Sequence, residues 1–582
     1  MPTKAIRGIA ASPGIAIGPI LRYEALKLVA NQKHTSDVQR ELLCLEEALL
    51  QARQEIHSFY EQANQSVGAQ EGAIFEAHEA FLKDPELLAQ VRTTIQQQSS
   101  TAAFAWQEGI ERYVSQLRLL HDEYLAARAA DLEDVGQRVL RILQGQKEQT
   151  LLLPEPAIIV ATDLTPSETV RFDTQKVCAF CTASGTPTSH AAILAKALGI
   201  PAITGLGADL AQLSDGLLVI VDGNTGEILL APDQETLARY RRYAQIQTQN
   251  QHIAFEATRQ PASTLDGKRV EIVANISSPD QVGEALAYGA EGIGLLRTEF
   301  LFLERATAPD EEEQVHIYRS ILEGMNQQPV VVRTFDIGGD KPAPYMPVAK
   351  EMNPFLGVRG IRLALTQKDL LQTQLRALLR AGVGQPLRIM FPMVSSSEEI
   401  DALREQLIEA RKTLEDWHIA TAENVQIGIM IEVPAAALMA DVLAEQVDFF
   451  SIGTNDLTQY TLAADRTNEA IAPFADALHP AVLRLIDTVC KAAHAHQRWV
   501  GLCGELGGDP LALPVLLGLG LDELSMTPKA IPLCKQQVRL YTQKQVHEIA
   551  QQALKKRNAA EVRAYLQDLW HPPNKQNGHT GL

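Results

Sequence analysis

Two kinds of hydrophobic pattern divide the chain. In the first, apolar residues recur at helical spacing from Val38 to Phe59, and similar segments follow near 71–96, 101–121 and 123–143. These segments contain few β-branched runs, and Asp84-Pro85 marks a break among them. The pattern predicts a bundle of roughly four long helices whose apolar stripes form an ordinary core.

The second pattern consists of short apolar runs typical of buried strands. Ala157–Val160 and Leu217–Val221 are two such runs, and Asp222–Gly226 has the composition of a hairpin turn. Residues 5–20, rich in Gly, Ala, Ile and Pro, predict further short strands with tight turns. The helical bundle is therefore expected to be inserted into an α/β domain that begins at the N-terminus and resumes near residue 150.

From residue 262 to about 570, strand-like and helix-like segments alternate. The candidate strands are Val270–Ala274, Gly292–Leu296, Val330–Phe335, Arg388–Met393, Gln426–Glu432, Asp448–Gly453, Trp499–Cys503 and Asp522–Ser525. Eight strands separated by helices over about 300 residues predict a (β/α)₈ TIM barrel.

The expected fold class is thus multidomain α/β. The expected boundaries are 1–34 and 144–232 for the α/β domain, 35–143 for the inserted bundle, 233–260 for a helical linker, 261–570 for the barrel, and 571–582 for a flexible tail.

Composition narrows the class of protein. A formal net charge of −19 argues against a nucleic-acid partner and favours a basic protein partner. The start of the chain lacks an apolar signal core and no run could cross a bilayer, so we expect a cytoplasmic protein without membrane insertion. Six cysteines in 582 residues are too sparse for a disulfide framework. The Cys178–Cys181 pair has the spacing of a metal or redox motif, but its strand-like flanks favour a structural role.

The stretch Gly185–His190 precedes an Ala-rich segment that ends at Gly199. It predicts a short helix capped by Thr188 or Ser189, with His190 in its first turn. Unpaired backbone N–H groups there favour an anion and a neutral imidazole, which is a nucleophile. His190 is therefore a candidate carrier of a phosphoryl group, although a histidine that merely caps a surface helix fits the local sequence equally well.

Polar residues gather at the predicted carboxyl ends of the barrel strands, where barrels of this kind carry their chemistry. They are Arg297, Arg333, Glu432, Asn455, Asp456, Arg466 and Cys503. Two carboxylates with a nearby amide oxygen suit Mg²⁺, with Mn²⁺ as the alternative. Three arginines at one mouth would hold a phosphorylated carboxylate through bidentate pairs. Any one of these residues could instead be an ordinary surface or salt-bridged group.

Taken in order, these motifs resemble the Enzyme I family of the bacterial phosphoenolpyruvate:sugar phosphotransferase system, over nearly the whole chain. The matching stretches are Ser12–Ala16, Phe75–Glu79, Asp84-Pro85, Asp163–Ser167, Thr188–His190, Gly338–Lys341, Asn353–Gly357, Phe391–Val394 and Gly501–Glu505. One departure is Lys196, where the family usually has arginine; the charge is kept but bidentate phosphate binding is lost.

The resemblance implies a phosphoenolpyruvate–protein phosphotransferase. His190 would carry the phosphoryl group to the phosphocarrier protein HPr, in the first step of sugar uptake, and Cys503 would protonate the enolate to give pyruvate. The implied roles of the remaining residues are phosphoenolpyruvate binding for Arg297, Arg333, Asn455, Asp456 and Arg466, Mg²⁺ binding for Glu432 and Asp456, and support for Lys341, Arg359, Met393 and Thr169. The resemblance also implies that the α/β domain swivels, that the bundle binds HPr, and that the barrel forms a homodimer.

Two alternatives remain at this point. A dikinase or phosphoenolpyruvate synthase shares the phosphohistidine domain and the barrel but needs a nucleotide-binding domain, and the bundle shows no phosphate-binding glycine-rich loop. A catalytically inactive adaptor that binds HPr would be expected to have lost part of the set His190, Glu432, Asp456 and Cys503, which is intact. Because the chain opens directly on the α/β domain, we expect the sugar branch of the family rather than the nitrogen branch.

Overall fold

The computed structural model describes the chain in two compact units, Met1–Thr248 and Gln249–Leu582. The residues outside the description are 1–3, 25–27, 31–32, 67–77, 120–122, 147–152, 154, 174–175, 186–188, 190–191, 193–194, 197–198, 244–254, 256–257, 304, 306, 339–344, 346–350, 466–467, 469–470, 472–473 and 571–582. The division between the units falls within the predicted linker 233–260, so the finer domain boundaries stay a prediction.

The first unit contains a mixed sheet of short strands. In spatial order these are β1 (Lys4–Arg7), β8 (Glu227–Leu230), β7 (Leu218–Asp222), β3 (Ile15–Tyr23), β4 (Ala157–Ala161), β5 (Val177–Thr182), β6 (Ala202–Thr204) and β2 (Ile9–Ser12). The predicted hairpin is confirmed, because β7 and β8 pair antiparallel across the turn. Strands β3 and β4 are parallel neighbours although more than 130 residues separate them.

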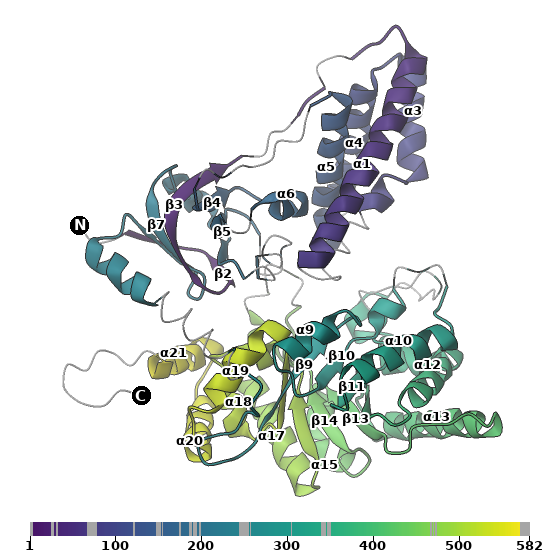
Figure 1. The fold of residues 1–582 in the computed structure, drawn as a ribbon, viewed down its shortest axis with the longest axis vertical. Coiled ribbons are helices and arrows are strands. Elements are labelled where there is room, and N and C mark those ends of the chain that lie inside the picture. Colours follow the sequence, from purple (N-terminus) through teal and green to yellow (C-terminus); the bar gives the residue numbers. More distant parts are fainter. Residues whose placement is uncertain are drawn as a thin grey trace. The chain divides into compact units, whose positions relative to one another are not determined.

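A helical bundle is inserted between β3 and β4, as the sequence predicted. Its helices are α1 (Val38–Ser66), α3 (Pro85–Gln98), α4 (Ala102–Leu119) and α5 (Glu123–Leu143) (Figure 1). Leu45, Trp106 and Val135 are fully buried in its core.

The break predicted at Asp84-Pro85 is confirmed. The chain turns at Leu82–Lys83, and α3 begins at Pro85 because the Asp84 carboxylate caps it, accepting from the N–H groups of Glu86 and Leu87 at 2.9 and 2.8 Å.

Polar contacts join the bundle to helix α6 (Pro166–Arg171) of the α/β part. The Ser167 hydroxyl donates to Asp134 of α5 at 2.5 Å, and the Arg138 guanidinium donates to the Ser167 oxygen at 2.8 Å. The buried His78 ring lies between Asp131 and Asp134, 3.6 and 3.8 Å from their carboxylate oxygens. These contacts fix the helix that carries Thr169, one of the predicted site residues.

The second unit is a closed barrel of eight parallel strands, which confirms the predicted fold. In chain order they are β9 (Glu271–Ile276), β10 (Ile293–Leu296), β11 (Val330–Arg333), β12 (Leu387–Phe391), β13 (Gln426–Ile431), β14 (Phe449–Ile452), β15 (Trp499–Leu502) and β16 (Glu523–Met526), and β16 pairs with β9. Each predicted strand overlaps one of them. The described α-helices of this unit are α9 (Gln281–Ala287), α10 (Glu311–Gly324), α11 (Ile361–Thr366), α12 (Lys368–Ala381), α13 (Ser397–Asp416), α14 (Pro434–Leu438), α15 (Ala440–Leu443), α16 (Thr454–Leu462), α17 (Pro480–Ala495), α18 (Leu513–Leu519), α19 (Ile531–Val538), α20 (Gln543–Ala553) and α21 (Ala559–Trp570).

Successive side chains of each strand point alternately outward and inward, so the barrel has two separate hydrophobic cores. The larger core lies between strands and helices, whereas Leu295, Val331, Met390, Met430 and Phe449 form a smaller cluster together with Cys503 inside the barrel. Within the described residues, no helix combines the length and the apolar character that a membrane crossing requires.

The segment that leads into the barrel is fastened to it by Lys535 of α19. The buried Lys535 ammonium lies 3.0 Å from the Glu291 carboxylate and donates to the carbonyl oxygens of Thr258 and Gln260 at 2.9 and 3.4 Å. The Arg539 guanidinium also donates to the Gln260 carbonyl, at 2.7 Å. The chain just before β9 is therefore an integral part of the barrel unit.

Candidate functional site

The carboxyl ends of the barrel strands bring most of the predicted residues together. Arg333 is the last residue of β11, while Arg297, Glu432 and Cys503 directly follow β10, β13 and β15. Asn455 and Asp456 lie in the first turn of α16, just after β14. Because all strands run in parallel, these side chains share one mouth of the barrel.

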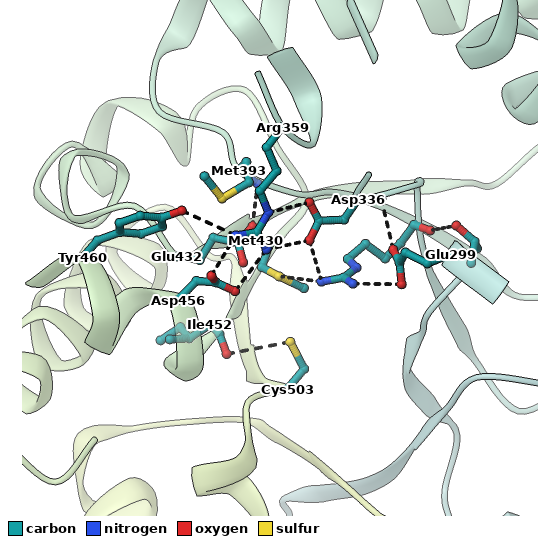
Figure 2. A network of polar contacts seen from close by, with 12 residues as sticks. Glu299, Asp336, Arg359, Met393, Met430, Glu432, Ile452, Asp456, Tyr460 and Cys503 are labelled. Atoms are coloured by element: carbon teal, nitrogen blue, oxygen red, sulfur yellow. Dashed lines mark hydrogen bonds and ion pairs between the residues drawn. The ribbon is translucent and has the colours of Figure 1, made fainter. Parts of the chain in front are cut away.

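A chain of ion pairs connects two of the arginines across the mouth (Figure 2). The Arg333 guanidinium lies 3.0 Å from Glu299 and 3.5 Å from Asp336. Asp336 also pairs with Arg359, at 2.9 Å, and Arg359 pairs with Asp456 at 3.0 Å. Burial opposes the charged form of Arg333, but the surrounding carboxylates outweigh it and raise its pKa. Both arginines are therefore held rigid and charged.

Glu432 is a deeply buried carboxylate of the mouth. Its Oε1 accepts the backbone N–H of Met393 at 2.5 Å. Burial, followed by the negative charges of Asp456 and Asp336, raises the pKa of Glu432 to about 8. A carboxylate in this position favours an added cation, because a cation would relieve the repulsion that disfavours its charge.

The donor set fits a divalent cation that shares its coordination with a substrate. Among the described residues no three His, Cys, Asp or Glu side chains form a complete metal site. Mg²⁺, however, commonly takes one or two carboxylates and completes its shell with substrate oxygens and water. Glu432 and Asp456 are the two carboxylates of the mouth that would fit this role.

Arg297 differs from Arg333 and Arg359 because no carboxylate among the described residues pairs with it. Its guanidinium makes no hydrogen bond or ion pair with any described residue. Burial, and next the positive charge of Arg333, lower the pKa of Arg297. A partly buried cation with no anionic partner among the described residues, placed beside a second cation, is suited to bind an anionic ligand.

Cys503 and Asn455 lie on adjacent strand ends. Burial raises the pKa of the Cys503 thiol to about 11, so it remains protonated at neutral pH. The Asn455 side chain forms reciprocal bonds with Glu505, accepting from its N–H and donating to its carboxylate, each at 3.1 Å. The mouth therefore holds a neutral acid next to arginines and carboxylates.

Comparisons with known proteins agree with this arrangement. Three family models match: the PEP-utilising enzyme N-terminal domain at residues 7–128, its mobile domain at 153–226, and its PEP-binding domain at 252–543. The phosphoenolpyruvate-protein phosphotransferase of Geobacillus stearothermophilus is 45% identical over 568 residues, which cover 97% of this chain and 98% of the relative. That of Bacillus subtilis strain 168 is 41% identical, with 97% and 99% covered.

The chain belongs to the phosphoenolpyruvate-protein phosphotransferase family.

Other similar proteins are longer or shorter than this chain. A multiphosphoryl transfer protein of Rhodobacter capsulatus is 44% identical, and the match covers 96% of this chain but 66% of the relative. A solution structure titled Enzyme I (nEIt) is 39% identical, covers 42% of this chain and 99% of its own, and has a TM-score of 0.36. The dikinase alternative is not favoured by these comparisons.

Three of the predicted residues, His190, Lys341 and Arg466, lie outside the described residues. Thr169 is described and fully buried; its hydroxyl donates at 2.9 Å to the carbonyl of Thr165, the residue that caps its own helix. Its predicted hydrogen bond near His190 therefore stays a prediction.

Sequence reasoning missed Glu299 and Asp336, the carboxylates that hold the arginines. Asp336 directly follows the predicted strand Val330–Phe335, and Glu299 comes three positions after the end of the predicted strand Gly292–Leu296. Position at a strand end is the signal that selected the other residues, and applying it to every charged residue would have found these two as well.

Proposed function

We propose that the chain transfers the phosphoryl group of phosphoenolpyruvate to His190 and then to HPr, releasing pyruvate. The observation that carries the proposal is Arg297, a partly buried cation without a described partner beside the fixed Arg333. Family membership supports the same substrate. Arg297 and Arg333, together with Arg466, would bind the phosphate and carboxylate groups.

In this mechanism each group of the mouth has one task. The arginines orient phosphoenolpyruvate so that its phosphorus lies in line with the His190 imidazole nitrogen, and the P–O bond breaks as the P–N bond forms. Asn455 would contribute to substrate binding. Glu432 and Asp456 would hold Mg²⁺ (Mn²⁺ as the alternative), which supplies neutralisation of phosphoryl charge when bound. Lys341, Arg359 and Met393 would support this arrangement.

The enolate that leaves must be protonated at carbon. Cys503 would donate its thiol proton to that carbon, giving pyruvate, and the thiolate would regain a proton from solvent. A thiol with a raised pKa suits this task because it still carries its proton at neutral pH.

His190 must meet both the barrel mouth and HPr, so we further propose that the α/β domain swivels about the linker 233–260. The bundle 35–143 would dock the basic partner, since it contributes none of the chemical groups. The barrel would form a homodimer; the exposed apolar side chains Leu438, Met439 and Val442 of α14 and α15 support an interface there.

The test uses phosphoenolpyruvate with a labelled phosphoryl group, Mg²⁺, and the full chain with or without HPr. We expect acid-labile label on the protein, its passage to HPr, and its loss in His190→Ala. His57→Ala, which changes an exposed histidine of α1, is the matched control and should label normally. Stoichiometric labelling of the His190→Ala protein would refute the assignment. Binding of HPr without any labelling of the unmodified chain would favour the inactive adaptor.

A further inference from the structure

Asn275, a residue that sequence reasoning did not select, lies beside Cys503 inside the barrel. It is the penultimate residue of β9, and because its neighbours Ala274 and Ile276 belong to the core between strands and helices, Asn275 faces the barrel interior. Its side-chain Nδ2 donates to the Cys503 carbonyl oxygen at 3.1 Å and to the Ser525 carbonyl oxygen at 3.5 Å. Its Oδ1 accepts the Ser525 hydroxyl at 2.6 Å, which fixes the amide orientation.

These contacts matter because Cys503 follows the last residue of its strand. The Cys503 N–H still donates to the Ile452 carbonyl of β14 at 3.0 Å. On the other side of the strand, β15 and β16 pair only at Gly501 and Leu502. The Cys503 carbonyl is therefore held by a side chain, Asn275, instead of by the sheet.

The turn after Cys503 is tightly packed on its opposite side. A Cβ added to Gly504 would lie 1.9 Å from the Thr454 hydroxyl, so only glycine fits there. The neighbouring Glu505 is joined to Asn455 by the reciprocal hydrogen bonds described above. Asn275 and Asn455 thus hold the Cys503–Glu505 turn from two different strand ends.

We propose that Asn275 is a positioning residue for proton donation by Cys503. This inference rests on the proposed function, in which the S–H bond of Cys503 breaks and a C–H bond forms on the enolate. Proton transfer needs the donor within hydrogen-bond reach of the accepting atom, so a displaced thiol slows this step alone. Substrate binding and phosphoryl transfer use other side chains and are left in place.

The experiment separates the two half-reactions in the full chain. For Asn275→Ala we expect labelling of the protein from phosphoenolpyruvate in a single turnover, a KM for phosphoenolpyruvate within about threefold of normal, and pyruvate formation slowed about 10–100-fold. Ser525→Ala keeps the amide but removes the hydroxyl that orients it, and should give a smaller loss in the same step. Gln372→Ala, which removes a buried amide of α12 bonded to Gln406, is the control and should leave pyruvate formation unchanged.

A double-mutant cycle distinguishes positioning from general support of the barrel. If Asn275 acts through Cys503, adding Asn275→Ala to Cys503→Ala should cause no further loss of pyruvate formation. Equal losses in both backgrounds would overturn the proposal, as would normal pyruvate formation in both Asn275→Ala and Ser525→Ala. Normal turnover of Cys503→Ala would overturn the role of Cys503 itself, and this inference with it.

Discussion

The backbone N–H of Met393 donates to the Glu432 carboxylate at 2.5 Å from a residue whose φ is +59°. A residue other than glycine rarely adopts this left-handed backbone conformation, which costs about 1–2 kcal/mol. Gly360 lies against it: a Cβ added there would be 2.9 Å from the Met393 Cβ. This strained residue supplies the backbone donor to the buried Glu432 carboxylate, and strain at such a site tends to serve function.

Substitutions of Met393 test that strain. Met393→Ala and Met393→Gly remove nearly the same packing, but only glycine adopts positive φ freely. We therefore expect the glycine variant to be more stable than the alanine variant by about 1 kcal/mol. Scanning calorimetry of the barrel transition measures the difference, and equal stability would show that the backbone relaxes when the side chain is removed.

Glu432→Gln tests the metal requirement. The amide keeps the size of the side chain and removes the negative charge that a divalent cation would need. We expect the Mg²⁺ concentration for half-maximal labelling of the protein to rise by about tenfold or more, since charge-assisted contacts contribute about 1.5–3 kcal/mol. Glu445→Gln, at an exposed position of the barrel, is the control. An unchanged Mg²⁺ requirement would remove Glu432 from the proposed ligand set.

Truncation of Arg333 and of Arg297 should have opposite effects on the stability of the ligand-free barrel. Arg333→Ala removes the arginine that pairs with the buried Glu299 carboxylate and leaves Asp336 with Arg359, so we expect the free energy of unfolding to fall by about 3–5 kcal/mol. Arg297→Ala leaves no described partner behind, so the ligand-free barrel should be as stable as before or more so. Its KM for phosphoenolpyruvate should nevertheless rise about 10–100-fold, because a bond to a charged group contributes about 1.5–3 kcal/mol.

Thermal unfolding without ligand, together with the KM values, checks this contrast. A large loss of stability in Arg297→Ala would mean that the guanidinium serves the fold instead of a ligand.

The opposite end of the barrel supplies a pH-dependent prediction. Burial raises the pKa of Glu523 from its ordinary 4.5 to about 7, although Arg388, 3.2 Å away, opposes the shift. Because the folded protein holds this proton more tightly, the stabilising contribution of Glu523 is full below pH 4.5 and is lost as the pH rises to about 7. The loss amounts to about 3 kcal/mol by linkage.

Glu523→Gln removes this titration. The free energy of unfolding of the variant, relative to the unmodified chain, should rise between pH 4.5 and 7 and then level off. Urea unfolding at several pH values measures it, with the exposed Glu445→Gln as the control. A difference that does not change with pH would show that folding does not raise the pKa of Glu523.

The barrel could be predicted from the sequence because each parallel strand is buried on both faces and is almost continuously apolar. The same continuous apolar character makes the strand ends difficult to locate from the sequence. Val330–Phe335 was predicted as one strand, but β11 ends at Arg333, and the buried Phe335 N–H turns instead to the Gln374 side chain at 3.1 Å. An apolar run indicates burial, and burial continues after pairing stops.

The contacts within the site could not be predicted in the same way. The strand-end rule places Arg297 and Arg333 at one mouth, but it does not tell which of them has a carboxylate partner. Such pairing depends on which residues meet in three dimensions, and the partners can be far apart in the chain: Arg359 and Asp456 are separated by 97 positions. The role of Asn275 was invisible for the same reason, since its two partners lie more than 220 residues away.

The contacts of Lys535 with the segment before β9 determine where the chain can be truncated without damage to the barrel. A barrel expressed from residue 261 would match the predicted boundary but would lack the Thr258 and Gln260 carbonyls. Its buried ammonium would then keep only Glu291. The smallest fragment that preserves the barrel should begin before Phe255, whose ring packs against Tyr288 at 5.7 Å. A truncation series read by melting temperature would therefore place the structural edge of the barrel inside what the sequence marks as linker.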